Sequence, residues 1–379
     1  MLKHLHVDNY KCLVNFDLDL QPLNLLLGAN GSGKSAIFDV MYAVRQLLSG
    51  VARVGDRDIF PTTTLTRWQT LPKQTFECTV ELAGDEFTYT LEVEHELATR
   101  RARVTLERLS SSNKPIFSFI NSEVTLYRDD FSKGAQFTSD WSESALARVA
   151  PRRDNQRLTR FLDFMRKILV CGLYPRSFLA EAATEDPLLL RDGSNFTAWY
   201  RHIFQERQDL IPDYLDDIRN VIDGLSGIRL EKVGQETRAF MIAFVRERVR
   251  YELRLDELSD GQRALIALYA LVRITQGQGY TLFLDEPDNY VALAEMQPWL
   301  MAIKDTTADG LVPQVVFSSH HPEFIDYLGA EAGVWLHRDH GGPTRVKPLQ
   351  ASPESPLKLS EVISRGWLYT QPHHAPAAE

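Results

Sequence analysis

Hydrophobic and polar residues alternate along the N-terminal part of the chain, as the side chains of half-buried strands do. The runs Leu2–Asp8 and 14–20 predict a β-hairpin, and the mostly apolar run Leu23–Leu27 predicts a strand buried on both faces. Two further alternating runs, 76–82 and 87–93, are joined by a short turn that contains glycine and predict a second hairpin. An antiparallel sheet is therefore expected here, and the strand-like runs 104–109 and 123–127 would extend it.

Between residues 142 and 223 the apolar positions recur every three or four residues, which is the spacing of one face of a helix. Strand-like patterns return at 228–232, 239–245 and 249–255. The helical pattern has two groups, which are Leu158, Phe161, Leu162, Met165, Ile168 and Leu169, and then Phe196, Trp199, Tyr200, Ile203 and Phe204.

These patterns predict an α/β fold in four segments. An N-terminal lobe would cover 1–141, a helical insertion 142–225 and a C-terminal lobe 226–369. A helix at 357–368 would close the C-terminal lobe, and the polar tail at 370–379 is expected to be disordered.

Composition and charge indicate the class of protein and its cellular compartment. The 379 residues are 44% hydrophobic and 25% charged, which is ordinary for a globular protein, and the formal net charge is −9. An overall negative field does not steer a protein to DNA or to acidic membranes, although local basic patches can. Cys12, Cys78 and Cys171 follow no metal-ligand spacing, and no apolar run approaches the roughly 20 residues of a membrane-spanning helix. We expect a cytoplasmic protein with free thiols and no membrane partner.

The sequence GANGSGKS at residues 28–35 lies between the buried strand and a helix-like pattern, which is the setting that a nucleotide-binding P-loop requires. Its glycines allow successive N–H groups to turn toward phosphate oxygens, and the helix adds the positive end of its dipole. Lys34 would contact the β- and γ-phosphates, and Ser35 would hold Mg²⁺. With ATP and Mg²⁺ as the expected ligands, the nucleotide-binding residues would be Asn30, Gly31, Ser32, Gly33, Lys34, Ser35 and Ala36.

A second motif lies in the C-terminal half, where an apolar strand ends in Asp285 and Glu286. Because the strand is buried, it would deliver Asp285 to the coordination sphere of Mg²⁺. Glu286 would lie beside the γ-phosphate, where it can orient or deprotonate the attacking water. Together with the P-loop, this pair predicts an ATPase in which Lys34 and Glu286 are catalytic.

Shortly before that strand, the run LSDGQ at 258–262 opens a predicted helix, with Ser259 as N-cap and Asp260 complementing the helix dipole. This run resembles the signature motif of ABC-type ATPases. In that family two heads sandwich two ATP molecules, and the P-loop of one head faces the signature of the other. The resemblance implies that Ser259, Asp260, Gly261 and Gln262 serve a second copy of the chain, and that an isolated monomer would hydrolyse ATP poorly.

The same resemblance implies two further elements. The run SSHHP after the strand-like segment 315–317 is similar to the family's switch-histidine motif, and His320 fits best by its position relative to Pro322. His320 would hydrogen-bond the γ-phosphate and be a third catalytic residue. The family's Q-loop glutamine would be Gln69 or Gln74, and both remain candidates.

Other runs indicate a branch of the family. NYKCL at 9–13 resembles the start of RecF-, SMC- and OLD-like heads, and DGSN at 192–195 resembles an element of stand-alone AAA15/AAA21-type ATPases. The chain thus resembles a stand-alone ABC-type P-loop ATPase. The implied fold is a head with a P-loop core sheet, an antiparallel β-subdomain and a helical insertion.

The resemblance implies ATP-driven dimerisation, as a homodimer or a higher even oligomer, that serves a DNA-processing or anti-phage defence complex with a nuclease as effector partner. Basic clusters at 100–103, 152–153 and 246–250 could contact DNA, or could be solvated faces paired with acidic residues. Three alternatives stay open. They are a RecF-like DNA repair ATPase, an ABC transporter subunit, which the long insertion argues against, and a nucleotide-sensing scaffold with little turnover.

Overall fold

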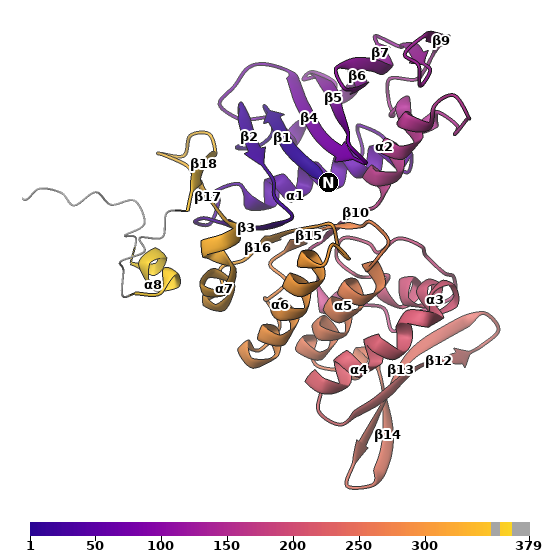
Figure 1. Ribbon diagram of the computed structural model, residues 1–379, viewed down its shortest axis with the longest axis vertical. Coiled ribbons are helices and arrows are strands. Elements are labelled where there is room, and N and C mark those ends of the chain that lie inside the picture. Colours follow the sequence, from indigo (N-terminus) through magenta and orange to yellow (C-terminus); the bar gives the residue numbers. More distant parts are fainter. Residues whose placement is uncertain (350–356, 366–379) are drawn as a thin grey trace, which may run out of the picture.

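A mostly parallel sheet runs through the middle of the molecule, and the P-loop lies at the carboxyl ends of its parallel strands. The computed structural model describes residues 1–349 and 357–365. The strands of this sheet are β3 (Leu23–Leu27), β10 (Ile168–Cys171), β15 (Thr281–Asp285), β16 (Gln314–Ser318), β17 (Gly333–His337) and β18 (Arg345–Pro348). Their order is β10-β15-β16-β3-β17-β18, and only β18 is antiparallel to its neighbour (Figure 1).

Successive side chains of these strands enter two different hydrophobic cores, as the period of two in a strand requires. Leu26 and Phe283 belong to one core, whereas Leu25 and Leu284 belong to the other. Because both faces are covered, these strands have nearly continuous apolar sequences rather than alternating ones. The same burial fixes the ends of the strands, where the polar motifs begin.

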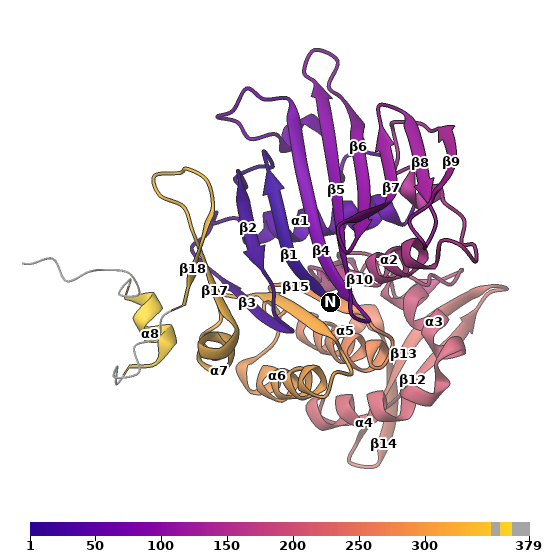
Figure 2. The ribbon, with the colours of Figure 1, turned by 45° about the horizontal axis from the view of Figure 1, so that its top comes forward.

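An antiparallel sheet of eight strands and helix α1 (Lys34–Leu48) cover one face of the central sheet (Figure 2). Phe38 of α1 packs edge-on against Phe283, with 5.7 Å between the ring centroids. The strand order is β2-β1-β4-β5-β6-β7-β8-β9, so both predicted hairpins and their extension are confirmed. The bounds are β1 (Leu2–Asp8), β2 (Phe16–Asp19), β4 (Lys73–Leu82), β5 (Asp85–Glu96), β6 (Arg101–Ser111), β7 (Lys114–Ile120), β8 (Glu123–Tyr127) and β9 (Lys133–Thr138).

Helices and a small sheet cover the other face (Figure 1). In the part of the chain that the structure describes, the helices after α1 are α2 (Gln156–Arg166), α3 (Phe196–Glu206), α4 (Ile211–Val221), α5 (Asp260–Thr275), α6 (Leu293–Ala308), α7 (Pro322–Ala332) and α8 (Leu359–Ser364). Short 3-10 turns are η1 (Thr62–Thr64), η2 (Leu146–Arg148), η3 (Pro175–Ser177), η4 (Gln208–Leu210) and η5 (Leu255–Glu257). In the small sheet, strand β13 (Thr237–Arg246) pairs with β11 (Glu181–Ala182), β12 (Leu225–Val233) and β14 (Val249–Arg254).

The predicted helical pattern of residues 142–225 is wrong at Ile168 and Leu169, which belong to strand β10 of the central sheet. A buried strand of four apolar residues has the same sequence appearance as a buried turn of helix. The helix expected around residue 200 is confirmed as α3. Helix α4 packs on α5, where the Tyr214 hydroxyl donates to the Ile266 carbonyl at 3.0 Å. The boundaries at 141 and 225 stay a prediction.

The remaining structural expectations concern the C-terminus, the cysteines and membranes. Helix α8 covers part of the helix predicted at 357–368, while the tail at 370–379 lies outside the described residues. Cys12, Cys78 and Cys171 are free thiols, as predicted. Among residues 1–349 and 357–365, every helix is too short or too polar to span a bilayer.

Candidate functional site

The P-loop turns tightly between β3 and α1, and two glycines make this turn possible. Gly28 has φ +148° and Gly33 has φ +108°, a backbone region that side chains disfavour. A Cβ atom at Gly28 would also lie 2.3 Å from the Leu336 carbonyl oxygen, and one at Gly33 would lie 2.6 Å from Thr344 Oγ1. The loop can therefore hold this shape only with glycine at both positions.

A cleft of about 490 Å³ opens at the P-loop, and all seven predicted nucleotide-binding residues line it. Glu286 from the end of β15 and His320 from the end of β16 line the same cleft. Parallel strands end at one edge of a sheet, which brings the three motifs together although they are far apart in sequence. The other lining residues are Lys11, Cys12, Asp39, Thr63, Leu65, Arg67, Trp68 and Arg338.

Lys34 is folded back across the P-loop and is only 6% exposed. Its Nζ donates to the carbonyl oxygen of Gly28 at 2.7 Å and to that of Ala29 at 3.4 Å. Burial lowers the pKa of Lys34, while the carboxylates of Glu286 and Asp285 act in the opposite direction. An ammonium group whose hydrogen-bond partners are carbonyls of the phosphate-binding loop fits a site for an anionic ligand.

One serine at the end of β16 fixes both acidic residues. The Ser318 hydroxyl donates to Asp285 Oδ1 at 2.5 Å and accepts from the Glu286 backbone N–H at 3.0 Å. Burial raises the pKa of Asp285, and the hydrogen bond from Ser318 is the largest influence that lowers it. Glu286 has φ +47°, an uncommon conformation for this residue type, and Asn289 Nδ2 donates to its Oε2 at 2.9 Å. Ser318 thus sets the relative positions of the two carboxylates.

The two histidines of the SSHHP run have different environments. His320 Nε2 lies 3.8 Å from Glu286 Oε1 in the cleft. Burial, and then the nearby Lys34, lower the pKa of His320 below its ordinary value. His321 instead caps α7, because its Nδ1 accepts from the Glu323 N–H at 3.2 Å. The geometry therefore places His320, not His321, beside Glu286.

The residues predicted to hold Mg²⁺ meet at this edge of the sheet. Burial raises the pKa of Asp285, and the nearby Ser35 hydroxyl is among the groups that lower it. A buried carboxylate is costly to keep charged unless positive charge compensates it. Within the described residues no group of three His, Cys, Asp or Glu side chains could bind a metal alone. Mg²⁺ is usually held by one or two protein oxygens together with phosphates and waters, so this donor set fits it.

The sequence motifs did not reveal an ion-pair bridge that links the P-loop helix to the acidic pair. Asp39 of α1 accepts from Lys11 Nζ at 2.5 Å and from Arg191 at 2.5 Å. Arg191 also lies 3.8 Å from Asp285 Oδ2. Lys11 belongs to the NYKCL run and Arg191 directly precedes the DGSN run. Both runs therefore marked segments whose charged residues lie near the site. Their meeting point at Asp39 depends on tertiary structure.

Trp68 and Arg338 form another part of the cleft that the sequence did not suggest. The Arg338 guanidinium lies 5.5 Å from the centre of the Trp68 ring and donates to the Gly31 carbonyl at 3.0 Å. Trp68 remains 49% exposed, which leaves much of its ring surface open to solvent. An exposed tryptophan beside a phosphate-binding loop is well suited to stack with a flat ring.

The residues predicted to form the signature motif lie outside the P-loop cleft. In the described part of the chain, the cleft is not lined by any of the four residues Ser259, Asp260, Gly261 and Gln262. Ser259 caps α5, and its hydroxyl accepts from the Gln262 N–H at 3.3 Å. Arg176 of η3 donates to Asp260 at 2.8 Å. One chain therefore presents a P-loop cleft and, away from it, the partly exposed start of α5, where the signature is predicted.

The two Q-loop candidates differ sharply. Gln74 is fully buried in β4, where it bonds His95 Nε2 at 2.9 Å and the Asn9 carbonyl at 3.0 Å. Gln69 lies half-buried in the loop next to Trp68. Neither glutamine lines the cleft within the described residues.

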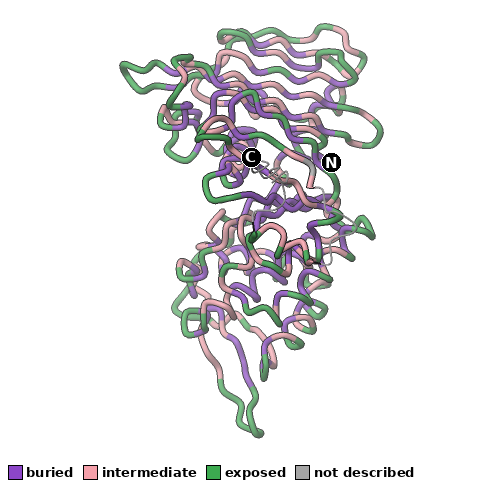
Figure 3. The backbone as a smooth tube through the Cα atoms, turned by 90° about the vertical axis from the view of Figure 1, so that its left-hand side faces the viewer, coloured by how far each residue is buried: buried purple, intermediate pink, exposed green. Residues whose placement is uncertain are grey.

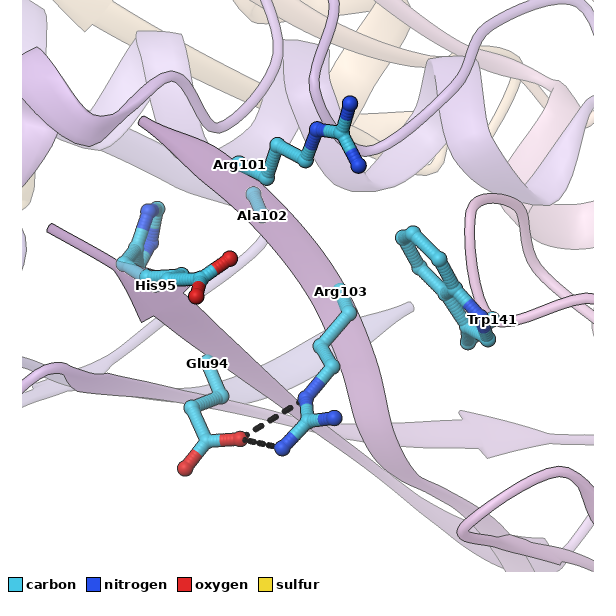
Figure 4. A pocket seen from close by; sticks show the side chains of 7 residues that line it. Glu94, His95, Arg101, Ala102, Arg103 and Trp141 are labelled. Carbon is cyan, nitrogen blue, oxygen red and sulfur yellow. Dashed lines mark hydrogen bonds and ion pairs between the residues drawn. The ribbon is translucent and has the colours of Figure 1, made fainter. Parts of the chain in front are cut away.

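A second cavity, of about 390 Å³, lies beside His95 (Figure 4). Arg103 donates to Glu94 at this cavity, and Trp141 forms one of its walls.

The P-loop on a mostly parallel sheet, with an acidic pair at the end of a neighbouring strand, defines a P-loop ATPase. The family model for AAA_21, an AbiEii toxin-like AAA domain of type IV toxin–antitoxin systems, matches residues 23–326. The chain belongs to this family. No curated protein matches the chain.

Proposed function

We propose that the protein binds and hydrolyses ATP with Mg²⁺. The observation that carries this proposal is the position of Glu286, which shares one cleft with the P-loop and with His320. A carboxylate beside a phosphate-binding loop is the group that an in-line attack by water needs. Ser35 and Asp285 would hold Mg²⁺, which would neutralise the phosphate charge when bound.

Each residue of the cleft would have a distinct role. Glu286 would accept the proton of the attacking water on its carboxylate. Lys34 would leave the loop carbonyls and bind phosphate oxygens, together with the backbone N–H groups of residues 30–36. His320 has a lowered pKa, so it would be neutral at pH 7 and would donate a hydrogen bond to the γ-phosphate.

Trp68 would bind the nucleobase. Its exposed ring lies in the P-loop cleft, and the Arg338 guanidinium lies 5.5 Å from the centre of the ring. Base stacking on an aromatic side chain contributes about 1–3 kcal/mol and does not depend strongly on the base. This contact would increase ATP affinity without selecting adenine over guanine.

The ATP-bound form would be a homodimer or a higher even oligomer in which each copy completes the site of its partner. The separation of the partly exposed Ser259–Asp260 helix start from the cleft of the same chain supports this arrangement. A helix N-terminus favours anions, and Ser259 retains a hydroxyl that could reach a phosphate. ATP would therefore act as the link between two copies.

The biological role would be anti-phage or toxin–antitoxin defence, in which the ATP-dependent dimer controls an effector partner, such as a nuclease, that acts on DNA. The chain belongs to a family whose description names an AbiEii toxin of type IV toxin–antitoxin systems, and this membership supports a defence role. Cycles of ATP binding and hydrolysis would switch the complex between two states.

The test of the enzymatic proposal is the variant Glu286→Gln. Phosphate release should fall by about 10²–10⁴-fold, because the general base is lost while the shape of the cleft is kept. ATP binding should remain, and ATP-bound dimers should accumulate. The matched control is Glu331→Gln, which removes an exposed carboxylate paired with Lys304 outside the cleft. Unchanged turnover in Glu286→Gln would refute the assignment.

A further inference from the structure

A two-stranded ribbon formed by β13 and β14 projects from the body of the molecule (Figure 1). Its tip lies at one end of the longest axis, opposite the eight-stranded sheet, and every residue from 245 to 251 is exposed (Figure 3). The pairing of Arg246 with Val249 closes the ribbon in a two-residue turn. The tip is therefore accessible from both faces and from its end.

The tip of the ribbon is rich in arginine. Among the described residues, Arg246, Arg248 and Arg250 form no ion pair, and the one acidic residue of the tip is Glu247. Two arginines nearer the body of the same sheet are paired, Arg229 with Glu252 at 2.5 Å and Arg254 with Glu181 at 2.9 Å. In a chain with a formal net charge of −9, the ribbon tip is thus a local site of net positive charge.

The turn at the tip uses residues that do not favour its backbone shape. Glu247 has φ +50° and Arg248 has φ +72°, and a two-residue hairpin turn of this kind is normally Asn-Gly or Asp-Gly. Side chains cost energy in this region relative to glycine. The turn therefore holds the Arg248 side chain at the outermost point of the ribbon although glycine would relieve the strain.

Apolar side chains stiffen the ribbon and flank its arginines. Phe244 and Tyr251 stack across the strands with 5.5 Å between ring centroids and 13° between ring planes. Val249 is 64% exposed and shares a face with Arg246, while Arg250 lies on the opposite face. The ribbon consequently presents a cationic side chain on each face and a third at its end.

We propose that this ribbon, defined by residues 244–251, binds duplex DNA by inserting into the major groove. The major groove of B-form DNA is about 12 Å wide and admits a two-stranded β-ribbon, with phosphates on both walls for arginines on both faces. The deep, narrow major groove of A-form RNA does not admit side chains, so the shape favours DNA. Phosphate contacts would provide most of the affinity, and binding would be largely independent of sequence.

The ribbon also has a direct connection to the signature helix. Strand β14 ends at Arg254, and the chain then passes through η5 to Ser259. DNA held at the tip would therefore restrain the segment that leads into the signature. The proposal itself does not depend on ATP hydrolysis, because binding at the tip can be measured with or without nucleotide.

The test measures the fluorescence anisotropy of a labelled DNA duplex of about 30 base pairs, roughly three helical turns, against the full-length protein with and without ATP. The variant is Arg246→Glu, Arg248→Glu and Arg250→Glu together. All three side chains are exposed, so the fold should be kept. We expect the wild-type protein to bind and its affinity to fall with salt. The variant should lose at least about tenfold in affinity and show a shallower salt dependence.

The matched control has the same change in charge on the N-terminal side of the molecule, with Arg101→Glu, Arg108→Glu and Arg153→Glu. These arginines are exposed and form no ion pair among the described residues. Binding equal to wild type in this control would support the ribbon as the DNA site. The proposal is overturned if the wild type does not bind DNA, if both variants lose the same affinity, or if the ribbon variant changes only the oligomeric state. Tighter binding to duplex RNA than to DNA would also overturn it.

Discussion

The signature helix begins with an ion pair in which Arg176 Nε donates to Asp260 Oδ2 at 2.8 Å. Asp260 stands where ABC-type signatures commonly have glycine, and in the proposed dimer this helix start faces a triphosphate. A bare carboxylate there would repel the phosphates, whereas the paired carboxylate is neutralised. The exposed position of Arg176, whose side chain is 69% exposed, argues against a large role in folding.

The variant Arg176→Ala should therefore reduce ATPase turnover by about tenfold, which corresponds to about 1.4 kcal/mol. The double variant Arg176→Ala with Asp260→Asn removes both charges and should recover activity to within about threefold of wild type. The measurement is kcat for the wild type, both single variants and the double variant, with thermal unfolding as the check on folding. A double variant no faster than Arg176→Ala would refute the neutralising role.

Ser318 offers a test of how the acidic pair is positioned. The variant Ser318→Ala removes the donor to Asp285 and the acceptor for the Glu286 N–H, so kcat should fall by about tenfold. The Mg²⁺ concentration needed for half-maximal turnover should also rise, which loss of stability alone would not cause. The control is Ser319→Ala, because that hydroxyl accepts from the His321 N–H and contacts neither carboxylate. An identical Mg²⁺ response in both variants would contradict the assignment.

Trp68 provides a test of the nucleobase site. Replacing it with alanine should raise KM for ATP by about tenfold with kcat nearly unchanged, because stacking contributes about 1–3 kcal/mol to binding. Trp68→Phe should retain most of the affinity. The control is Trp141→Ala, which removes a tryptophan of similar exposure, 41% against 49%, from the second cavity. If both alanine variants had the same KM as wild type, Trp68 would not contact the base.

His95 makes folding stability depend on pH. It is 2% exposed, its Nε2 donates to Gln74, and its buried Nδ1 has no hydrogen-bond partner among the described residues. Burial lowers the pKa of His95 from 6.5 to about 4. Between these values the unfolded chain binds more protons than the folded chain, so this residue makes the free energy of unfolding rise with pH and fall on acidification.

The expected size follows from the two pKa values. When the pH is lowered from about 7 to about 4, His95 should reduce the free energy of unfolding by about 3 kcal/mol. Urea unfolding of the wild type and of His95→Gln across this range isolates the effect, since other titrating groups are common to both proteins. Parallel pH profiles for the two proteins would show that His95 titrates normally in the folded state.

The sequence predicted the parts of the site that depend on local order. GANGSGKS lies between a strand and a helix, and the acidic pair ends a buried strand, so each motif could be placed from its neighbours alone. The antiparallel hairpins were also predictable, because their alternation of apolar and polar residues reflects one buried face. The spacing to Pro322 favours His320 over His321 as the switch histidine, and the structure places His320 in the cleft.

Features formed by long-range contacts could not be predicted. Strand β10 is short and fully buried, so its sequence does not separate it from the helix before it. The position of Asp39 between Lys11 and Arg191 joins three distant segments of the chain. Trp68 lies in a loop without periodicity, and only its packing beside Arg338 indicates a role.

The central claim is that each ATP site needs two copies of the chain. Lys34→Ala disables the P-loop and leaves the signature intact. Ser259→Asp keeps an N-cap residue but places a carboxylate where the partner's triphosphate is expected. Each variant alone should be inactive, because both sites of its dimer are damaged.

The most direct measurement is the ATPase rate of an equal mixture of these two variants. A mixed dimer contains one intact site, formed by the P-loop of the Ser259→Asp copy and the signature of the Lys34→Ala copy. With free exchange of subunits, the account predicts recovery of about a quarter of the wild-type rate. A mixture that is no more active than the sum of its two components, although mixed dimers form, would contradict it.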